Sequence, residues 1–457
     1  MNVSKLSDWV DPQDHDTARA VLSKCVHCGL CNATCPTYQV AGNELDGPRG
    51  RIYLIKHMLE DGAATAKTQF HLDRCLSCLS CETTCPSGVK YGTLLKIGKK
   101  ALEDHVSRPP LFRLKRKLVL SLFLSPRLLD VIVATIYRMR WLLPASVRAV
   151  ISPIPVPPLR TIARNLWEGL AHIKIIERIK RHISKKNTVF ESQPQTVSSS
   201  SPDHTVLLLR GCVQDNLTPQ TNRATIQVLK TLGHAARLTP RGCCGALLAH
   251  SEKTSEAEAV VRQNIDLWLS AMNSGSGKLI TTASGCAAFI KTYPTMFHPD
   301  DDYLEKAHQV SENTIDIAAF MESVGYQGKF TKAKERPSVA MHCPCTLQHS
   351  LKQQPSTVQT VLDNLGFDVK SAAESHLCCG SAGSYSLFQP EMAHTLRERK
   401  LKHLRATQAQ TIATANVGCQ LHLSMGAKNR VYHWIELVAD QCLPQASEKH
   451  SPARPES

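Results

Sequence analysis

Two cysteine runs define the N-terminal part of the chain: Cys25-Val-His-Cys28-Gly-Leu-Cys31-Asn-Ala-Thr-Cys35-Pro36 and Cys75-Leu-Ser-Cys78-Leu-Ser-Cys81-Glu-Thr-Thr-Cys85-Pro86. Both follow the pattern C-x2-C-x2-C-x3-C-P without deviation. Three thiolates separated by two residues each wrap a compact loop around one [4Fe–4S] cluster, and the fourth cysteine, followed by proline, reaches a second cluster. The spacing therefore predicts a domain that binds two [4Fe–4S] clusters.

This rule assigns each run three ligands of its own cluster and one ligand of the other. The expected ligands of the first cluster are Cys25, Cys28, Cys31 and Cys85, and those of the second are Cys75, Cys78, Cys81 and Cys35. The alternative is structural zinc, which uses two C-x2-C pairs and gives no reason for a third cysteine and a trailing Cys-Pro in both runs. His27 lies inside the first loop, where we expect a neighbour of the cluster rather than a ligand.

The segment between the runs, Asp46-Gly-Pro-Arg49-Gly-Arg51-Ile-Tyr53, has two interpretations. Arg49 and Arg51 could lie near anionic sulfur and tune a cluster or dock a partner. The alternative is a turn that leads into a helix.

From residue 204 onward the sequence repeats itself. The first copy has Val206-Leu-Leu-Leu209, Gly211-Cys212, a helical stretch closed by Gly233, Cys243-Cys244-Gly245, Leu279-Ile-Thr-Thr282 and Ser284-Gly285-Cys286. The second has Val339-Ala-Met341, Cys343-Pro344-Cys345, a helical stretch closed by Gly366, Cys378-Cys379-Gly380, Ile412-Ala-Thr-Ala415 and Val417-Gly418-Cys419. Short apolar runs that alternate with helices are typical of parallel strands in an α/β layer. Each cysteine should then follow a strand, at the edge where open α/β sheets place ligands.

Each repeat offers a set of four thiols. Adjacent cysteines cannot easily form a mutual disulfide, because their Cα atoms lie only about 3.8 Å apart, but both can bind one metal centre. The more favoured additional site is Cys345 (or Cys343), Cys378, Cys379 and Cys419; the less certain one is Cys212, Cys243, Cys244 and Cys286. An iron–sulfur cluster, a zinc ion and a site that has lost its metal all stay open. We expect Gly245 and Gly380 to let the backbone approach the metal.

Histidines cluster around the second set: His342, His349, His376 and His422. They could donate protons to a bound quinone or simply cap helices. Cys442 stands alone and is expected to be a plain thiol.

Length and composition favour a multidomain metalloprotein. The chain has 457 residues, 18 cysteines and a formal net charge of +15, and this length predicts two to four domains. The sequence begins without an apolar signal segment, so we expect reduced cytoplasmic thiols that are available for metal. Nucleic acid is not expected as a partner, since no helix-turn-helix, zinc-finger or aromatic-basic motif appears.

The middle of the chain carries no cysteine and is basic. Residues 111–141 are apolar with interleaved arginine and lysine, which fits a peripheral membrane contact, a partner surface, or two amphipathic helices packed within the protein. No stretch is apolar and long enough to span a membrane. The proline-rich residues 153–158 break helices, and the low-complexity residues 191–202 are typical of a flexible linker.

We therefore predict an α+β and α/β multidomain chain. Its expected parts are a mostly helical dicluster domain of the ferredoxin type (1–105), a basic helical connector with a low-complexity linker (106–203), two α/β cysteine-rich repeats with a CCG motif (204–328 and 329–445) and a disordered tail (446–457).

The whole pattern resembles the iron–sulfur subunits of flavin-linked dehydrogenases, and most closely those of glycolate oxidase (glycolate dehydrogenase). The segments that carry the resemblance include Glu44-Leu-Asp-Gly-Pro-Arg-Gly-Arg-Ile-Tyr-Leu-Ile-Lys56, His71-Leu-Asp-Arg-Cys75, Thr282-Ala-Ser-Gly-Cys286, His342-Cys-Pro-Cys-Thr-Leu-Gln-His349 and His376-Leu-Cys-Cys-Gly-Ser-Ala-Gly383. Heterodisulfide reductase subunits share the repeats, but their repeat ends in C-x2-C. Here Cys419 is followed by His422 and Cys286 by Phe289 at that spacing, so their five-cysteine cluster is not expected.

The resemblance implies a role in a complex. Flavoprotein subunits would oxidise glycolate to glyoxylate on FAD, and this subunit would pass the electrons to a quinone-type acceptor at the inner face of the cytoplasmic membrane. The chain carries no dinucleotide fingerprint after a strand and no catalytic residue is assigned to it, so we expect no turnover by the chain alone. Lactate, glycerol-3-phosphate and heterodisulfide-type donors are the alternatives, followed by a scaffold or sensor with structural clusters.

Overall fold

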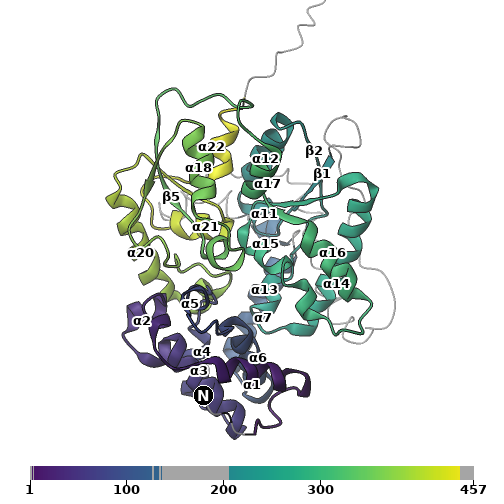
Figure 1. Ribbon diagram of the computed structural model, residues 1–457, viewed down its shortest axis with the longest axis vertical. Helices are drawn as coiled ribbons and strands as arrows, with labels where there is room; N and C mark the ends of the chain where they lie inside the picture. Colours follow the sequence, from purple (N-terminus) through teal and green to yellow (C-terminus); the bar gives the residue numbers. More distant parts are fainter. Residues whose placement is uncertain (1–2, 4, 126–127, 133–134, 136–204, 443–457) are drawn as a thin grey trace, which may run out of the picture.

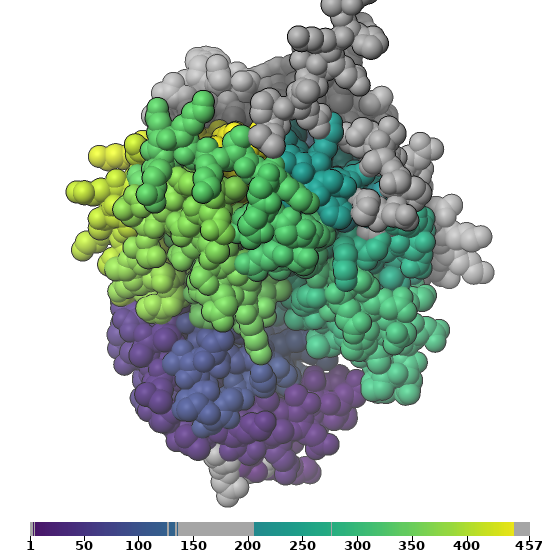
Figure 2. All heavy atoms as spheres, turned by 45° about the horizontal axis from the view of Figure 1, so that its top comes forward, coloured from purple at the N-terminus to yellow at the C-terminus, as the bar shows by residue number. Residues whose placement is uncertain are grey.

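The computed structural model describes residues 3, 5–125, 128–132, 135 and 205–442. An N-terminal helical domain lies against two α/β units that stand side by side (Figure 1). In the space-filling view the N-terminal domain lies beneath both units, with the second unit at the left and the first at the right (Figure 2).

The N-terminal domain is a set of short helices around the two cysteine loops. Its α-helices are α1 (His15–Lys24), α2 (Pro36–Ala41), α3 (Pro48–Asp61), α4 (Ala66–Asp73), α5 (Ser80–Thr84) and α6 (Tyr91–His105), with turns η1 (Pro12–Asp14), η2 (Leu30–Asn32) and η3 (Glu44–Asp46). Proline begins α2 and α3, where its missing N–H costs nothing, and left-handed Gly42 and Gly62 end them. Leu22 and Ile55 are fully buried among the helices, and this core holds the loops in place.

The first repeat is a parallel sheet with helices. It contains β1 (Thr205–Leu208), α11 (Gln214–Leu217), α12 (Pro219–Thr231), β2 (Ala235–Leu238), α13 (Ala246–Ala249), α14 (Thr254–Ala271), η6 (Met272–Ser276), β3 (Leu279–Thr281), α15 (Ser284–Ile290), η7 (Tyr293–Met296), α16 (Tyr303–Asn313), β4 (Thr314–Asp316) and α17 (Ile317–Val324). The strand order is β2-β1-β3-β4, and every pairing is parallel.

The second repeat has the same plan. It contains β5 (Ser338–His342), η8 (Thr346–Ser350), α18 (Ser356–Asn364), β6 (Asp368–Ser371), α19 (Tyr385–Phe388), α20 (Pro390–Ala406), β7 (Thr411–Thr414), α21 (Val417–Ser424), β8 (Val431–His433) and α22 (Trp434–Ala439). Its order is β6-β5-β7-β8, again all parallel. The predicted class, a helical cysteine domain followed by two α/β repeats, is therefore confirmed.

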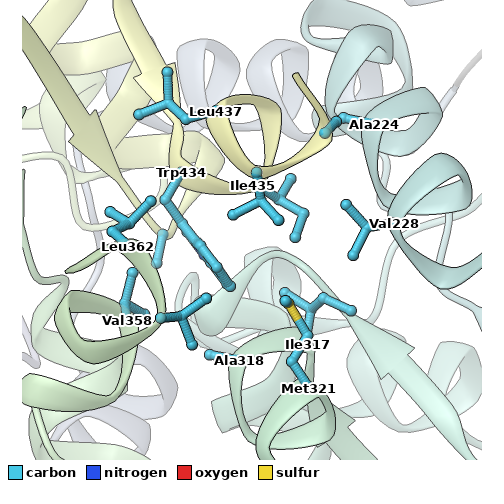
Figure 3. Packing of buried hydrophobic residues seen from close by; sticks show 14 of the residues in the cluster. Ala224, Val228, Ile317, Ala318, Met321, Val358, Leu362, Trp434, Ile435 and Leu437 are labelled. Carbon is cyan, nitrogen blue, oxygen red and sulfur yellow. The ribbon is translucent and has the colours of Figure 1, made fainter. Parts of the chain in front are cut away.

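The two repeats share one apolar core, in which side chains from both meet (Figure 3). Ile317 of the first repeat and Trp434 of the second are each fully buried in it. Polar contacts cross the same boundary: Thr221 Oγ1 donates to Glu436 Oε1 at 2.7 Å, and His433 Nε2 lies 2.8 Å from the carbonyl oxygen of Thr282. The repeats therefore act as one rigid support for their cysteine loops.

The connector is described only in part. Helix α7 (Pro110–Leu124) buries Arg116, which pairs with Glu103 of α6 and Glu252 of the first repeat. Leu111, Leu114 and Leu118 on α7 are exposed. One face of the predicted basic segment thus packs within the protein. The low-complexity linker, the proline-rich residues and the tail from residue 446 lie outside the described residues.

Within the ranges that the structure describes, no helix has both the length and the apolar character needed to cross a membrane.

Candidate metal centres

The first pocket lies between the first cysteine loop and the turn that follows α5. Its thiols are Cys25, Cys28, Cys31 and Cys85, with Cys81 at its inner wall, and they border one pocket. Gly29 has φ +82°, a left-handed conformation that other residues rarely adopt, and the guanidinium of Arg49 lies against it. Cys28 is exposed, and Val26 and Leu30 beside it are 68% and 55% exposed. The first pocket therefore opens at the surface.

The second pocket holds the remaining thiols. Cys35, Cys75, Cys78 and Cys81 border one pocket. Cys35 of the first run thus lies in the second pocket, and Cys85 of the second run lies in the first pocket. Cys81 borders both pockets. This grouping fits the crossed arrangement that the spacing predicts. The assignment of each thiol to a particular cluster stays a prediction.

Arg51 lies buried beside the second pocket. Its side chain is 1% exposed and pairs with the fully buried Asp46, which also contacts His71 and Arg74. Nη1 of Arg51 lies 3.1 Å from Thr37 Oγ1 and 4.0 Å from the sulfur of Cys35. A buried guanidinium near thiolates stabilises their negative charge.

Tyr91 is a second donor to this pocket. Its hydroxyl donates to the sulfur of Cys75 at 3.4 Å. Burial raises the pKa of the Cys75 thiol, but the charges of Arg51 and Lys99 and the hydroxyl of Tyr91 outweigh burial, so that its pKa falls below the usual value. The thiolate form, which is the metal ligand, is therefore favoured.

The structure bears on both interpretations of the segment between the cysteine runs. The segment does lead through a turn into α3, and it also brings Arg51 to Cys35. Arg49 is different, because it is half exposed, pairs with Glu44 and donates to the carbonyl oxygen of His27 at 3.3 Å. Arg49 thus supports the first loop through its backbone.

The first repeat brings its four thiols together. Cys243 is the hydrogen-bond partner of Cys212 and Cys244, and Cys244 is that of Cys286. The amide of Gly245 donates to the sulfur of Cys243 at 3.3 Å. Hydrogen bonds from its two neighbours hold the pKa of Cys243 well below the usual range. These thiols form one compact set.

The second repeat does the same and adds an imidazole. The sulfurs of Cys345 and Cys378 are 3.9 Å apart, and Cys379 links Cys378 to Cys419. One ring nitrogen of His342 and the sulfurs of Cys379 and Cys419 all lie within 4.8 Å of one another. Of the two cysteines left open by the sequence, Cys345 joins the set, whereas Cys343 lies in the apolar core and burial raises its pKa to about 12.

The glycines of the two CysCysGly motifs face protein. Gly380 has φ +91°, and a Cβ there would lie 2.7 Å from the carbonyl oxygen of Ala393 in α20. Gly245 has φ +95°, and its Cβ would meet Phe289 at 3.1 Å. Glycine is therefore required at both positions because the backbone is left-handed there and packs closely against neighbouring residues.

The remaining predicted residues have structural contacts. His349 Nδ1 lies 2.9 Å from Thr83 Oγ1 in the N-terminal domain, and His422 Nε2 lies 3.2 Å from the carbonyl oxygen of Ala393. His376 is exposed, and its backbone is a hydrogen-bond partner of His349. Cys442 is half buried, and its backbone forms an isolated β-bridge with Phe330.

The second repeat covers the second pocket. Leu76 and Cys78 belong to one buried cluster with Cys345 and Cys378, and the hydroxyl of Tyr385 donates to the carbonyl oxygen of Arg74 at 3.0 Å. Figure 1 shows α5, next to these residues, against the second repeat. Sequence reasoning missed Tyr91 and Tyr385, since neither belongs to a cysteine motif.

Comparison with known proteins agrees with this architecture. A family model for a "4Fe-4S dicluster domain" matches residues 21–89, and one for a "Cysteine-rich domain" matches residues 206–291 and 339–424.

Relatives match over most of the chain. The glycolate oxidase iron-sulfur subunit of Escherichia coli (strain K12) is 41% identical over 422 residues, which cover 92% of this chain and 94% of the relative. The probable glycolate oxidase iron-sulfur subunit of Bacillus subtilis (strain 168) is 28% identical over 438 residues, with the same shares covered. A lactate utilization protein A 2 of Bacillus cereus is 25% identical over 244 residues, 51% of this chain and 97% of the relative.

The matched domains and relatives identify an iron–sulfur protein with an electron-transfer role. Identity of 41% over nearly the full length, together with the dicluster domain and both cysteine-rich repeats, establishes its relationship. The chain belongs to the family of glycolate oxidase iron–sulfur subunits.

Proposed function

We propose that this chain is the electron-transferring subunit of a glycolate dehydrogenase complex. Partner flavoprotein subunits would oxidise glycolate to glyoxylate on FAD, and a quinone-type acceptor would receive the electrons at the inner face of the cytoplasmic membrane. The observation that carries the proposal is the gathering of eight cysteines into two adjacent pockets, one of which opens at the surface.

The residues of both pockets fit iron–sulfur clusters. Cys25, Cys28, Cys31 and Cys85 would hold one [4Fe–4S] cluster, and Cys75, Cys78, Cys81 and Cys35 the other. Clusters bound there would supply one-electron redox chemistry, which suits a subunit that receives electrons from a two-electron flavin. Cys345, Cys378, Cys379 and Cys419 form a candidate site for a further cluster or metal, as do Cys212, Cys243, Cys244 and Cys286.

The chain's own residues would set the conditions at each pocket. Exposed Cys28, with apolar Val26 and Leu30 beside it, offers a partner protein close approach to the first pocket. Arg51 and Tyr91 place positive charge and a hydroxyl donor at the second. Hydrogen bonds to cluster sulfurs are among the factors that set reduction potential.

The test is electron paramagnetic resonance on the anaerobically purified chain with its co-purifying partners, before and after addition of glycolate. Reduced [4Fe–4S] signals with glycolate are expected. The chain alone should give them with dithionite and not with glycolate. If the complex gives these signals with dithionite but not with glycolate, glycolate is excluded as its electron donor.

Lactate is the second donor to add, because a lactate utilization protein matches half of the chain. Glycerol-3-phosphate follows. Signals that appear only with one of these would move the proposal to that donor while leaving the electron-transfer role intact.

A further inference from the structure

The second repeat contains one buried imidazole that the first repeat lacks at the matching place. His342 stands three residues before Cys345 at the end of β5, and the residue three positions before Cys212 is Leu209. Leu209 packs in an apolar cluster that includes Cys244. The two repeats therefore share their thiols but differ in this donor.

The ring of His342 is buried and has one nitrogen without a hydrogen-bond partner. The side chain is 3% exposed. Nδ1 lies 2.9 Å from Thr414 Oγ1, whereas Nε2 is buried without a hydrogen-bond partner. When Nδ1–H donates to Thr414, the lone pair of Nε2 stays free. A histidine that binds metal usually fixes its tautomer in this way, with its other nitrogen bonded to an oxygen. A buried polar atom without a hydrogen-bond partner lowers the stability of the fold, and a bound metal would remove this penalty.

The donors near His342 are close enough together to share one ion. One ring nitrogen of His342 and the sulfurs of Cys379 and Cys419 lie within 4.8 Å of one another. Around a tetrahedral zinc ion with Zn–S bonds of about 2.3 Å, two sulfurs lie about 3.8 Å apart, so a small inward shift suffices. Thiolates on separate irons of a cluster must stand further apart than ligands of a single ion.

A buried positive charge lies beside these donors. Lys400 of α20 is 3% exposed, and its charge interacts with Cys378, Cys379 and Cys419. Its ammonium group donates to the carbonyl oxygen of Glu374 at 2.5 Å. A buried ammonium offsets the excess negative charge that two or three thiolates leave around a divalent cation.

We propose that His342, Cys379 and Cys419 form a mixed nitrogen–sulfur site for a single borderline-soft divalent cation of the Zn²⁺ type, with Cys378 nearest to a fourth position. This inference rests on the part of the proposed function that gives the second repeat a metal, and it makes that metal a structural ion. Cys345 then faces the second pocket beside Cys78.

The experiment uses the full-length chain, purified anaerobically, equilibrated with Zn²⁺ and freed of loose metal by gel filtration. Metal analysis should find one zinc per chain besides the iron, and zinc X-ray absorption should show nitrogen and sulfur ligands together. His342→Leu, which copies the first repeat, should weaken zinc binding about tenfold or more, since loss of even an outer-shell partner of a ligand costs about 10–100-fold.

Two further variants make the result decisive. His342→Cys should keep the zinc but give an all-sulfur shell, which a purely structural role of His342 would not produce. Cys442→Ser, at a half-buried thiol outside both cysteine sets, should leave zinc unchanged. Absence of zinc from the wild-type chain, an all-sulfur shell in the wild type, or iron and sulfide at these thiols would overturn the site. The signals of the N-terminal clusters report separately on the proposed function.

Discussion

The first pocket opens at the surface of the N-terminal domain, whereas the second repeat closes over the second pocket. The same cysteine spacing builds both. At the first, Cys28 is exposed and the nearby Arg49 is half exposed and touches backbone. At the second, Arg51 is buried next to Cys35, and Tyr91 donates to Cys75. The same cysteine motif can therefore build an open pocket or a covered one, because residues outside the motif set the solvent access and the local charge.

The largest effect should come from Arg51. Arg51→Leu leaves the buried Asp46 with Arg74 as its remaining cationic partner and His71 as a hydrogen-bond partner, and breaking a buried ion pair costs about 3–5 kcal/mol. We expect the free energy of unfolding to fall by about 3 kcal/mol, the lower end of this range, as measured by urea unfolding followed by circular dichroism. The second cluster should also be retained less well.

Arg49→Leu at the first pocket is the matched control. Its ion pair with Glu44 is more than one-third exposed on both sides, and such pairs contribute about 0–1 kcal/mol. If Arg49→Leu and Arg51→Leu lowered the free energy of unfolding equally, the proposed difference between an exposed ion pair at the first pocket and a buried one at the second would be wrong.

An intermediate effect is expected from Tyr91. Tyr91→Phe removes the hydroxyl that donates to Cys75, which should cost about 1 kcal/mol and lower the midpoint potential of the second cluster only. Redox titration monitored by paramagnetic resonance measures both clusters at once. Tyr53→Phe, on the exposed ring near His27, should move neither potential. A shift of the first cluster alone in Tyr91→Phe would show that the pockets are wrongly assigned.

The smallest effect should follow from the contact between Thr83 and His349, which joins the N-terminal domain to the second repeat in an exposed setting. Thr83→Val should lower stability by about 0.5 kcal/mol, read as a small shift of the thermal midpoint. Thr93→Val, on an exposed position of α6, serves as the comparison. A loss above that of Tyr91→Phe would mean that this exposed contact contributes more to closing the second pocket than the buried residues do.

Local patterns in the sequence predicted the cysteine runs, the duplicated α/β units and the parallel sheets, because these features depend on spacing along the chain. The roles of Tyr91 and Tyr385 could not be predicted, since each acts on a residue far away in sequence: Tyr385 donates to Arg74. The sequence placed His342 near the cysteines, but its free Nε2 depends on Thr414 in a neighbouring strand. The choice between Cys343 and Cys345 likewise required the direction of each side chain after β5.

The exchange of Cys35 and Cys85 between the two runs has a consequence for biogenesis. A ribosome that has released only the first run has made three of the thiols bordering the first pocket, while the fourth is Cys85. The first pocket cannot be completed until Cys85 has been synthesised, and the second cannot be completed until Cys81 has been synthesised. We therefore expect both clusters to be loaded together, after the second cysteine run has been synthesised. Substitution of a cysteine in either run should then impair the maturation of both clusters.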